Sequence, residues 1–185
     1  MVDDIYSDVK DRMDKAVQAM VKSFGKIRTG RATPALLEGL SADYYGTPTP
    51  ITQMASVTAP EARLLMIQPW DAQAIGEIEK AILKSELGLT PQNDGKIIRI
   101  SIPSLTQERR KELSKLVKKN AEEAKVAIRN SRRDANEMLK DLKKDKEIGE
   151  DDQTKAEAQV QKITDDFVKQ IDASAATKEK EIMEF

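Results

Sequence analysis

The chain has 185 residues, of which 34% are charged and only 4% aromatic, and its formal net charge is −1. It contains no cysteine and no histidine, which excludes disulfides, thiolate nucleophiles, classical zinc sites and Ser-His or Cys-His catalytic pairs. This composition favours helices with wide solvated faces, and it favours a binding protein over an enzyme. We expect no catalytic residue, no metal site and no cofactor.

The first residues are acidic and lack the apolar core of a signal peptide. No apolar run approaches the roughly 20 residues that span a bilayer. We therefore expect a cytoplasmic protein without a membrane partner.

Residues 1–29 predict one helix. Asp3 and Asp4 lie in its first turn, where acidic side chains interact favourably with the helix dipole. Apolar residues recur at spacings of three and four, as a single buried face requires: Ile5, Val9, Met13, Ala16/Val17, Met20, Phe24 and Ile27.

Helix breakers are concentrated in the middle of the chain. All seven prolines lie between residues 34 and 103, whereas the flanking segments hold none and only Gly25 and Gly149. Such a shift in composition marks a domain boundary at each end of the middle segment.

The middle segment predicts a small α+β domain. Residues 62–68 and 96–102 are expected to be strands, the second entered through the turn signal Asn93-Asp94-Gly95, and residues 74–83 a helix. Tyr44 and Tyr45 fall in this domain, where we expect them to be core aromatics.

The last part of the chain predicts two long helices. The first has Thr106 as its expected N-cap and runs to about Glu147, with Gly149 placed to end it. Its expected buried stripe is Leu113, Leu116/Val117, Ala124, Ile128, Ala135, Met138 and Leu142. The second begins at Glu150-Asp151-Asp152, and its expected stripe is Ala156, Val160, Ile163, Phe167, Ile171, Ser174 and Ile182.

No one of these helices can bury its stripe alone, but three antiparallel helices can. We therefore predict a two-domain α+β protein, in which residues 1–29 and 106–185 form a three-helix bundle and residues 32–103 form a small inserted domain. Two short connections, near 30–31 and 104–105, read as hinges through Gly30, Arg31, Ser104 and Leu105. A rigid, well-packed junction is the alternative.

Charge is divided between the last two helices. Residues 106–146 carry 14 Lys and Arg against 8 Asp and Glu, a net +6, and residues 147–185 carry 5 against 11, a net −6. Part of this division pairs neighbouring helices, but at about 100° per residue seven cations fall within about 40° of one line. They are Lys111, Lys118, Lys125, Arg129, Arg132, Lys140 and Lys143.

This basic line predicts a nucleic-acid backbone as a partner, because arginine forks onto phosphate and a polyanion neutralises adjacent like charges. Its densest part is Arg129-Asn130-Ser131-Arg132-Arg133. The alternative is a solvated charged face with i,i+4 pairs, for which Asp134, Glu137 and Asp141 are available. No aromatic lies on this helix, so stacking on bases is not expected.

Six motifs in order along the chain resemble bacterial ribosome recycling factors. They are residues 26–32 (KIRTGRA), 44–50 (YYGTPTP), 87–91 (LGLTP), 105–110 (LTQERR), 127–135 (AIRNSRRDA) and 178–185 (KEKEIMEF). The matches run in order over essentially the whole chain.

The resemblance implies a rod of three helices with a small β/α/β domain, set in an L shape like a transfer RNA. It implies a monomer that binds the post-termination 70S ribosome through large-subunit 23S rRNA. With elongation factor G and GTP, such a factor splits the ribosome into subunits and releases mRNA and tRNA, and initiation factor three then keeps the subunits apart. The GTPase is the elongation factor, and this chain has no P-loop.

Carried over by residue, the resemblance makes Arg129 and Arg132 the central rRNA-contacting arginines. Arg133 and Arg110 are supporting candidates, and Lys118 and Lys125 share the basic line. Ser131 stands where Ile or Val is expected and points toward the apolar stripe.

Two other function classes compete with this interpretation. A non-ribosomal nucleic-acid-binding or chaperone-like helical protein would need the basic line but not the motifs near Gly30. A hydrolase using Asp151 and Asp152 has little support, because that pair lies where helix-start acids belong.

Overall fold

The computed structural model describes residues 1–184, so Phe185, the last residue of the closing motif and of the predicted bundle, lies outside the described residues. The chain divides into two compact units. One consists of residues 1–28 and 107–184, and the other of residues 29–106.

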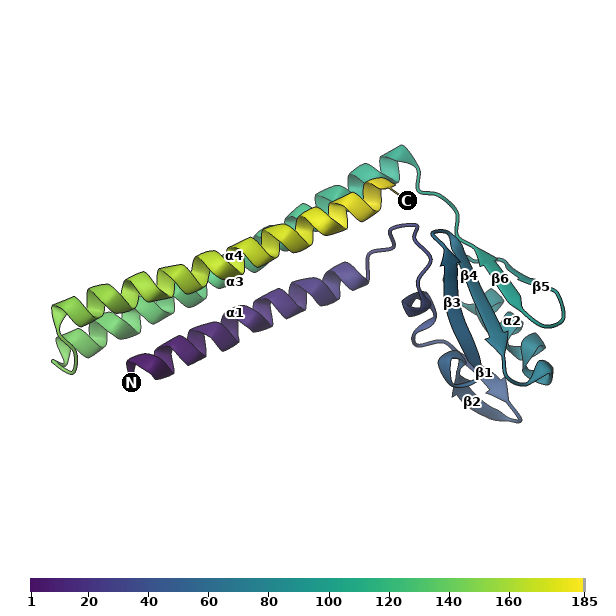
Figure 1. Cartoon of the computed structure of the whole chain (residues 1–185), viewed down its shortest axis with the longest axis horizontal. Coiled ribbons are helices and arrows are strands. Elements are labelled where there is room, and N and C mark those ends of the chain that lie inside the picture. The colour runs from purple at the N-terminus through teal and green to yellow at the C-terminus, as the bar shows by residue number, and fades with distance from the viewer. Residues whose placement is uncertain (185) are drawn as a thin grey trace. The chain divides into compact units, whose positions relative to one another are not determined.

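The first unit is a bundle of three helices: α1 (Val2–Gly25), α3 (Gln107–Lys144) and α4 (Glu150–Glu184). Each helix packs against both others. α1 and α4 run in the same direction and α3 runs against them (Figure 1). The predicted three-helix bundle with an inserted β/α/β domain is therefore confirmed. Within residues 1–184, no helix is both long enough and apolar enough to traverse a bilayer.

The stripe predicted for α1 is buried from Ile5 to Ile27, with Ala16 at its half-buried edge. The stripe predicted for α3 was wrong at Met138, which is 43% exposed, whereas Leu139 beside it is fully buried. Of the predicted pair Leu116/Val117, only Val117 is buried, and Leu142 is half-buried. On α4, Phe167 is only half-buried and Thr164 takes the core position. Residues three or four positions apart lie on the same helix face, so periodicity does not decide which of two adjacent residues is buried. The neighbouring helix decides it, because it covers one flank of the stripe.

α3 ends earlier than predicted, and Gly149 does not end it. Its last helical residue is Lys144, and Lys146 adopts the left-handed conformation with φ 62°. The amide of Glu147 donates to Leu142 O at 2.9 Å, and the amide of Lys146 donates to Lys143 O at 3.0 Å. This pair of bonds is the Schellman motif, with Lys146 at the position where glycine is usual. Gly149 instead directly precedes α4, and its carbonyl accepts from the amide of Gln153 at 3.0 Å.

The second unit is built on an antiparallel sheet of order β3-β4-β6-β5, with a separate hairpin β1–β2 and one α-helix, α2 (Ile75–Lys84) (Figure 1). Every strand pair in the unit is antiparallel. The strands are β1 Ser41–Tyr44, β2 Thr47–Pro50, β3 Ala55–Glu61, β4 Leu64–Pro69, β5 Pro91–Asn93 and β6 Ile98–Ser101. Three short 3-10 helices connect them: η1 Pro34–Leu37, η2 Ile51–Gln53 and η3 Ala72–Ala74.

The predicted strands 62–68 and 96–102 correspond to β4 and β6, the two central strands of the sheet. Their alternate residues are buried, and α2 adds Ile78 and Ile82 to the same core. The turn signal before β6 is confirmed, because Gly95 has φ 91° and its amide donates to Asn93 Oδ1 at 2.7 Å. β2, β3 and β5 contain prolines and lie at sheet edges, where a missing N–H costs no ladder bond.

The expectation that Tyr44 and Tyr45 are core aromatics was wrong. Their exposed fractions are 37% and 74%. Trp70, the residue before Asp71, is 70% exposed as well. Tyr45 and Gly46 form the tip of the β1–β2 hairpin, both with positive φ (50° and 83°), as the tight turn of a two-residue hairpin requires. The core of this unit is aliphatic instead.

We predict that Lys146→Gly stabilises the protein by about 0.5–1 kcal/mol, because glycine adopts the left-handed conformation without the steric cost of a Cβ. Chemical denaturation of the full chain measures the change. Lys146→Ala is the matched control, since it removes the same ammonium group and keeps the Cβ. An equal gain in both variants would assign the effect to charge and contradict the backbone argument.

Candidate nucleic-acid interface

The basic line of α3 lies along its edge with α4, and part of it is neutralised there. Lys125 Nζ is 2.5 Å from Asp172 Oδ1, and its side chain is only 24% exposed. Lys118 Nζ lies 3.8 Å from Glu179, and Lys143 Nζ lies 3.5 Å from Glu150. The opposite net charges of the two helices are thus used in pairs across their seam. Exposed pairs of this kind contribute about 0–1 kcal/mol each.

The two central arginines of the sequence prediction are half-buried on the same edge. Arg132 Nη1 donates to Gln161 Oε1 of α4 at 3.0 Å, and Arg129 Nη2 lies 2.5 Å from Glu122 Oε1 of α3 itself. A guanidinium has five N–H donors. One neutral acceptor leaves Arg132 with its full charge and most of its donors for an external anion.

Arg133 is the most available of the predicted arginines. It is exposed, and it has no ion-pair partner among residues 1–184. The neighbouring Asp134 does not form an i,i+4 ion pair with a cation of the basic line, because its carboxylate is paired with Arg12 of α1.

Arg110 has a structural contact of its own. Its Nη1 donates to the carbonyl of Met183 at 2.7 Å, in the last turn of α4. The last turn of α4 has no basic residue. Arg110 therefore supplies from α3 the cation that a helix C-terminus favours.

The structure also brings together an exposed basic row that the sequence analysis did not identify as one face of the helix, although it named Lys140 and Arg133 individually. At about 100° per residue, this row is rotated by about 100° around the axis of α3 from Arg132, toward the side away from α4. It consists of Lys115, Arg133, Lys140 and Lys144, all exposed. The signal that identifies this row is the absence of α4 on that flank, which requires knowing how the helices pack.

Ser131 is buried as predicted, with 5% of its surface exposed. Its hydroxyl donates to the carbonyl of Ala127 at 3.1 Å, one helical turn back. This bond satisfies the buried oxygen without a partner from another helix. The spacing of Arg129, Arg132 and Arg133 is therefore that of an ordinary α-helix.

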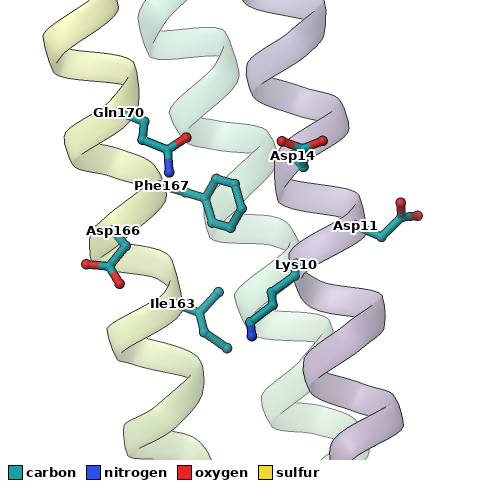
Figure 2. Close-up of a pocket in the computed structure, with 7 residues that line it drawn as sticks. All are labelled: Lys10, Asp11, Asp14, Ile163, Asp166, Phe167 and Gln170. Atoms are coloured by element: carbon teal, nitrogen blue, oxygen red, sulfur yellow. The ribbon is translucent and has the colours of Figure 1, made fainter.

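The opposite side of the bundle has the other sign of charge. An open groove of ≈ 480 Å³ lies between α1 and α4, and Figure 2 shows Phe167 and Gln170 reaching from α4 toward α1. Its rim carries three carboxylates, Asp11, Asp14 and Asp166, against one cation, Lys10. Because carboxylates repel phosphate, this side of the bundle is less suited to a nucleic acid than the α3 face.

The segments predicted as hinges contain neither helix nor strand. Gly30 has φ 77°, in the left-handed region that favours glycine, and Arg31 is exposed. Ser104 is exposed and Leu105 half-buried on the return segment.

The sheet unit is tied together immediately beyond these segments. The amide of Ala32 donates to Ala62 O at 2.7 Å, and the amide of Ile102 donates to Arg63 O at 2.8 Å. The chain thus enters and leaves the unit at one end of the β3–β4 hairpin.

Residues 1–184 contain no group of three or more acidic side chains placed to hold a metal ion. Asp151 and Asp152 lie exposed in the first turn of α4.

Comparison with known proteins gives a consistent result. A family model described as ribosome recycling factor matches residues 20–183. The chain is 59% identical over 184 residues to the ribosome-recycling factor of Syntrophobacter fumaroxidans, covering 100% of both chains. It is 58% identical over 185 residues to that of Desulfatibacillum aliphaticivorans, again with 100% of both chains covered.

Two solved structures are similar over almost their full length. A solution structure of a ribosome recycling factor is 41% identical, with a TM-score of 0.77, and the match covers 100% of this chain and 98% of the other. The second is 46% identical, with a TM-score of 0.67 and 98% of each chain covered. It describes models of the T. thermophilus ribosome recycling factor and the E. coli elongation factor G bound to the E. coli post-termination complex.

Proposed function

The chain belongs to the ribosome recycling factor family, and from that premise we propose that it recycles ribosomes after translation termination. Its partners are the post-termination 70S ribosome and elongation factor G, as in the second similar structure. Together with GTP, the two factors split the ribosome into subunits, so that mRNA and tRNA are released. The chain acts as a cytoplasmic monomer and performs no catalysis itself, because the GTPase is the elongation factor.

The observation that carries this proposal at the residue level is the exposed basic face of α3. Arg129, Arg132 and Arg133 form its centre, and the row from Lys115 to Lys144 extends it over about 45 Å at 1.5 Å per residue. We assign this face to the phosphate backbone of large-subunit 23S rRNA. It has no aromatic side chain, so it grips the backbone and does not read bases.

The other predicted rRNA-binding residues take lesser parts in this proposal. Lys118 and Lys125 already pair with α4, so each must exchange a carboxylate for a phosphate before it contributes. Arg110 fastens the end of α4, and it serves the interface by holding that helix in position.

The two-unit organisation has a role in the same proposal. Gly30 and Arg31 on one segment, and Ser104 and Leu105 on the other, are the hinges about which the sheet unit reorients. Short connections free of helix and strand support this assignment, because few backbone hydrogen bonds must break when they move. Reorientation lets one unit hold rRNA while the elongation factor acts on the other.

The first prediction of this proposed function is subunit splitting. Purified post-termination ribosomes should separate into subunits when this chain, elongation factor G and GTP are all present, and not when any one is omitted. Light scattering follows the reaction, and sedimentation confirms the products. If intact ribosomes persist while the chain still binds RNA, the non-ribosomal alternative is the better one.

The second prediction concerns the arginines. Arg132→Glu and Arg133→Glu should each weaken binding to large subunits by at least about tenfold, or about 1.4 kcal/mol. Neither change removes a core contact, so the thermal unfolding temperature should stay close to that of the unsubstituted chain. Each Arg→Ala variant should also lower the slope of log Kd against log salt by about 1.

The matched control is Lys162→Glu, the same change in charge on an exposed lysine of α4. It should leave the affinity for large subunits near its original value. Equal losses for Lys162→Glu and Arg133→Glu would show that net charge alone matters, and would contradict a specific α3 interface.

The third prediction concerns the hinges. NMR relaxation of the full chain should require separate rotational diffusion tensors for residues 1–28 with 107–184 and for residues 29–106. Amides of the segments around Gly30 and Ser104 should have lower order parameters than those of the units. A single tensor that fits both units would favour the rigid junction.

A further inference from the structure

A small pocket on the sheet unit combines exposed tyrosine rings with carboxylates. Its volume is ≈ 170 Å³, and it opens between the tip of the β1–β2 hairpin and the start of α2. The side chains that form it are Asp43, Tyr44, Tyr45, Asp71, Gln73 and Glu77. None of them belongs to the α3 face or to the hinge segments.

Asp71 holds this arrangement in place. Its Oδ2 accepts from the hydroxyls of Tyr45 and Tyr44, with O···O distances of 3.1 and 3.3 Å. Its Oδ1 accepts from the backbone amide of Gln73 at 2.9 Å. The Gln73 amide and the Tyr45 hydroxyl hold the pKa of Asp71 below its usual value, so the carboxylate is charged at neutral pH.

The rings are fixed relative to one another as well as to Asp71. Tyr44 and Tyr45 meet edge to face, with centroids 4.6 Å apart and an interplanar angle of 75°. Tyr45 also has φ 50°, a left-handed conformation that is uncommon for a bulky residue. The hairpin turn is secured beneath them, because Asp43 Oδ1 accepts from the amide of Gly46 at 2.7 Å.

The hydrogen bonds that hold the hairpin against Asp71 involve only the tyrosine hydroxyls. They leave the exposed parts of the rings available for other contacts. Tyr45 remains 74% exposed, although aromatic side chains dominate the energetics of protein interfaces. A rigid aromatic side chain loses little conformational entropy when it binds. A strained backbone and a preorganised, exposed pair of rings are together typical of a recognition surface.

The charge of the pocket decides the kind of partner. Three carboxylates line it and no cation does. One of the three, Glu77, is paired with the exposed Lys80 at 2.9 Å, which leaves a net charge of −2 at the pocket. Carboxylates repel phosphate and attract cations, and the faces of tyrosine rings add cation–π attraction. A nucleic acid is therefore the wrong partner for this surface.

We propose that this tyrosine pocket is a docking point for a protein partner that inserts one arginine or lysine side chain into it, beside the tyrosine rings and toward the carboxylates. The volume is that of one long side chain, and the exposed edge of Tyr45 is left to pack against the partner's backbone. The inference does not depend on the ribosomal function, since it uses only residues of the sheet unit.

The test is an NMR titration of the full chain with the peptide Ac-Ala-Arg-Ala-amide. We expect saturable shifts at the amides from Tyr44 to Gly46 and from Asp71 to Gln73, and a shift of the indole N–H of Trp70, the single tryptophan, which precedes Asp71. The same peptide with citrulline in place of arginine is a neutral isostere and should give no saturable shift. Equal binding of the citrulline peptide would overturn the proposal.

Two substitutions and a control locate the binding. Tyr45→Leu removes a π face and Glu77→Gln removes a charge, and each should weaken the arginine peptide by about two- to fivefold. Glu86→Gln removes a charge from an exposed residue of the same unit outside the pocket and should leave binding unchanged. A loss with Glu86→Gln as large as with Glu77→Gln would reduce the effect to general electrostatics and contradict a pocket.

A spermidine arm distinguishes a protein partner from a free polyamine. Spermidine should shift these amides at no lower concentration than it shifts amides beside other exposed acids. Tighter and saturable binding of spermidine at the pocket than of the arginine peptide would exclude the protein-docking role.

Discussion

Each of the three long helices carries a single apolar stripe, and none can remove that stripe from water alone. Packing α1, α3 and α4 together is therefore the constraint from which the rest follows. α1 contributes Met13 and Val17, α3 Val117 and Ile128, and α4 Val160 and Ile171 to the shared core. Burying side chains of this size contributes about 1.5–3 kcal/mol each relative to leaving them exposed. Because α1 precedes the insert and α3 follows it, the bundle also brings both ends of the insert to one end of the rod.

The same packing decides which charges remain available. Of the two basic surfaces of α3, α4 covers the edge that contains Arg132 and leaves exposed the row that contains Arg133. Lys125 and Asp172 meet across that seam, whereas Arg133 faces away from it. A chain with a net charge of −1 thus presents a basic surface, since residues 106–146 carry a net +6 and residues 147–185 a net −6. Net charge would not have indicated a polyanion as partner, but the placement of charge does.

Much of the fold could be predicted because its signals are local. The stripe of α1, the break in composition at both ends of the insert and the turn before β6 each depend on residues close in sequence. The edge strands were missed because prolines such as Pro48 and Pro60 argue against strands, although at an edge their missing N–H is harmless. The end of α3 was missed because a lysine, Lys146, occupies a position that usually signals itself with glycine.

The candidate site was predictable in its residue types and less so in its exposure. Periodicity identifies a basic line. Only tertiary packing reveals that Lys125 is paired with an acid of α4 and that Lys115 and Lys140 are exposed beside Arg133. The prediction that the tyrosines are core residues was wrong for a related reason. An aromatic pair in a small domain usually belongs to the core, and the exposure of Tyr45 follows from its place at a hairpin tip.

The two units offer surfaces that select partners by opposite rules. On α3, a row of exposed cations beside Arg132 suits a repeating polyanion, and affinity comes from many similar contacts that salt weakens together. At the tyrosine pocket, one enclosed volume with fixed rings and a charged Asp71 suits a single cationic side chain, and affinity depends on a few residues. Under these two proposals, like charge excludes each partner from the other's surface, so RNA on the bundle and a basic protein segment on the sheet unit would not compete. Two sites of opposite sign on one small chain are therefore suited to linking a nucleic acid to a protein.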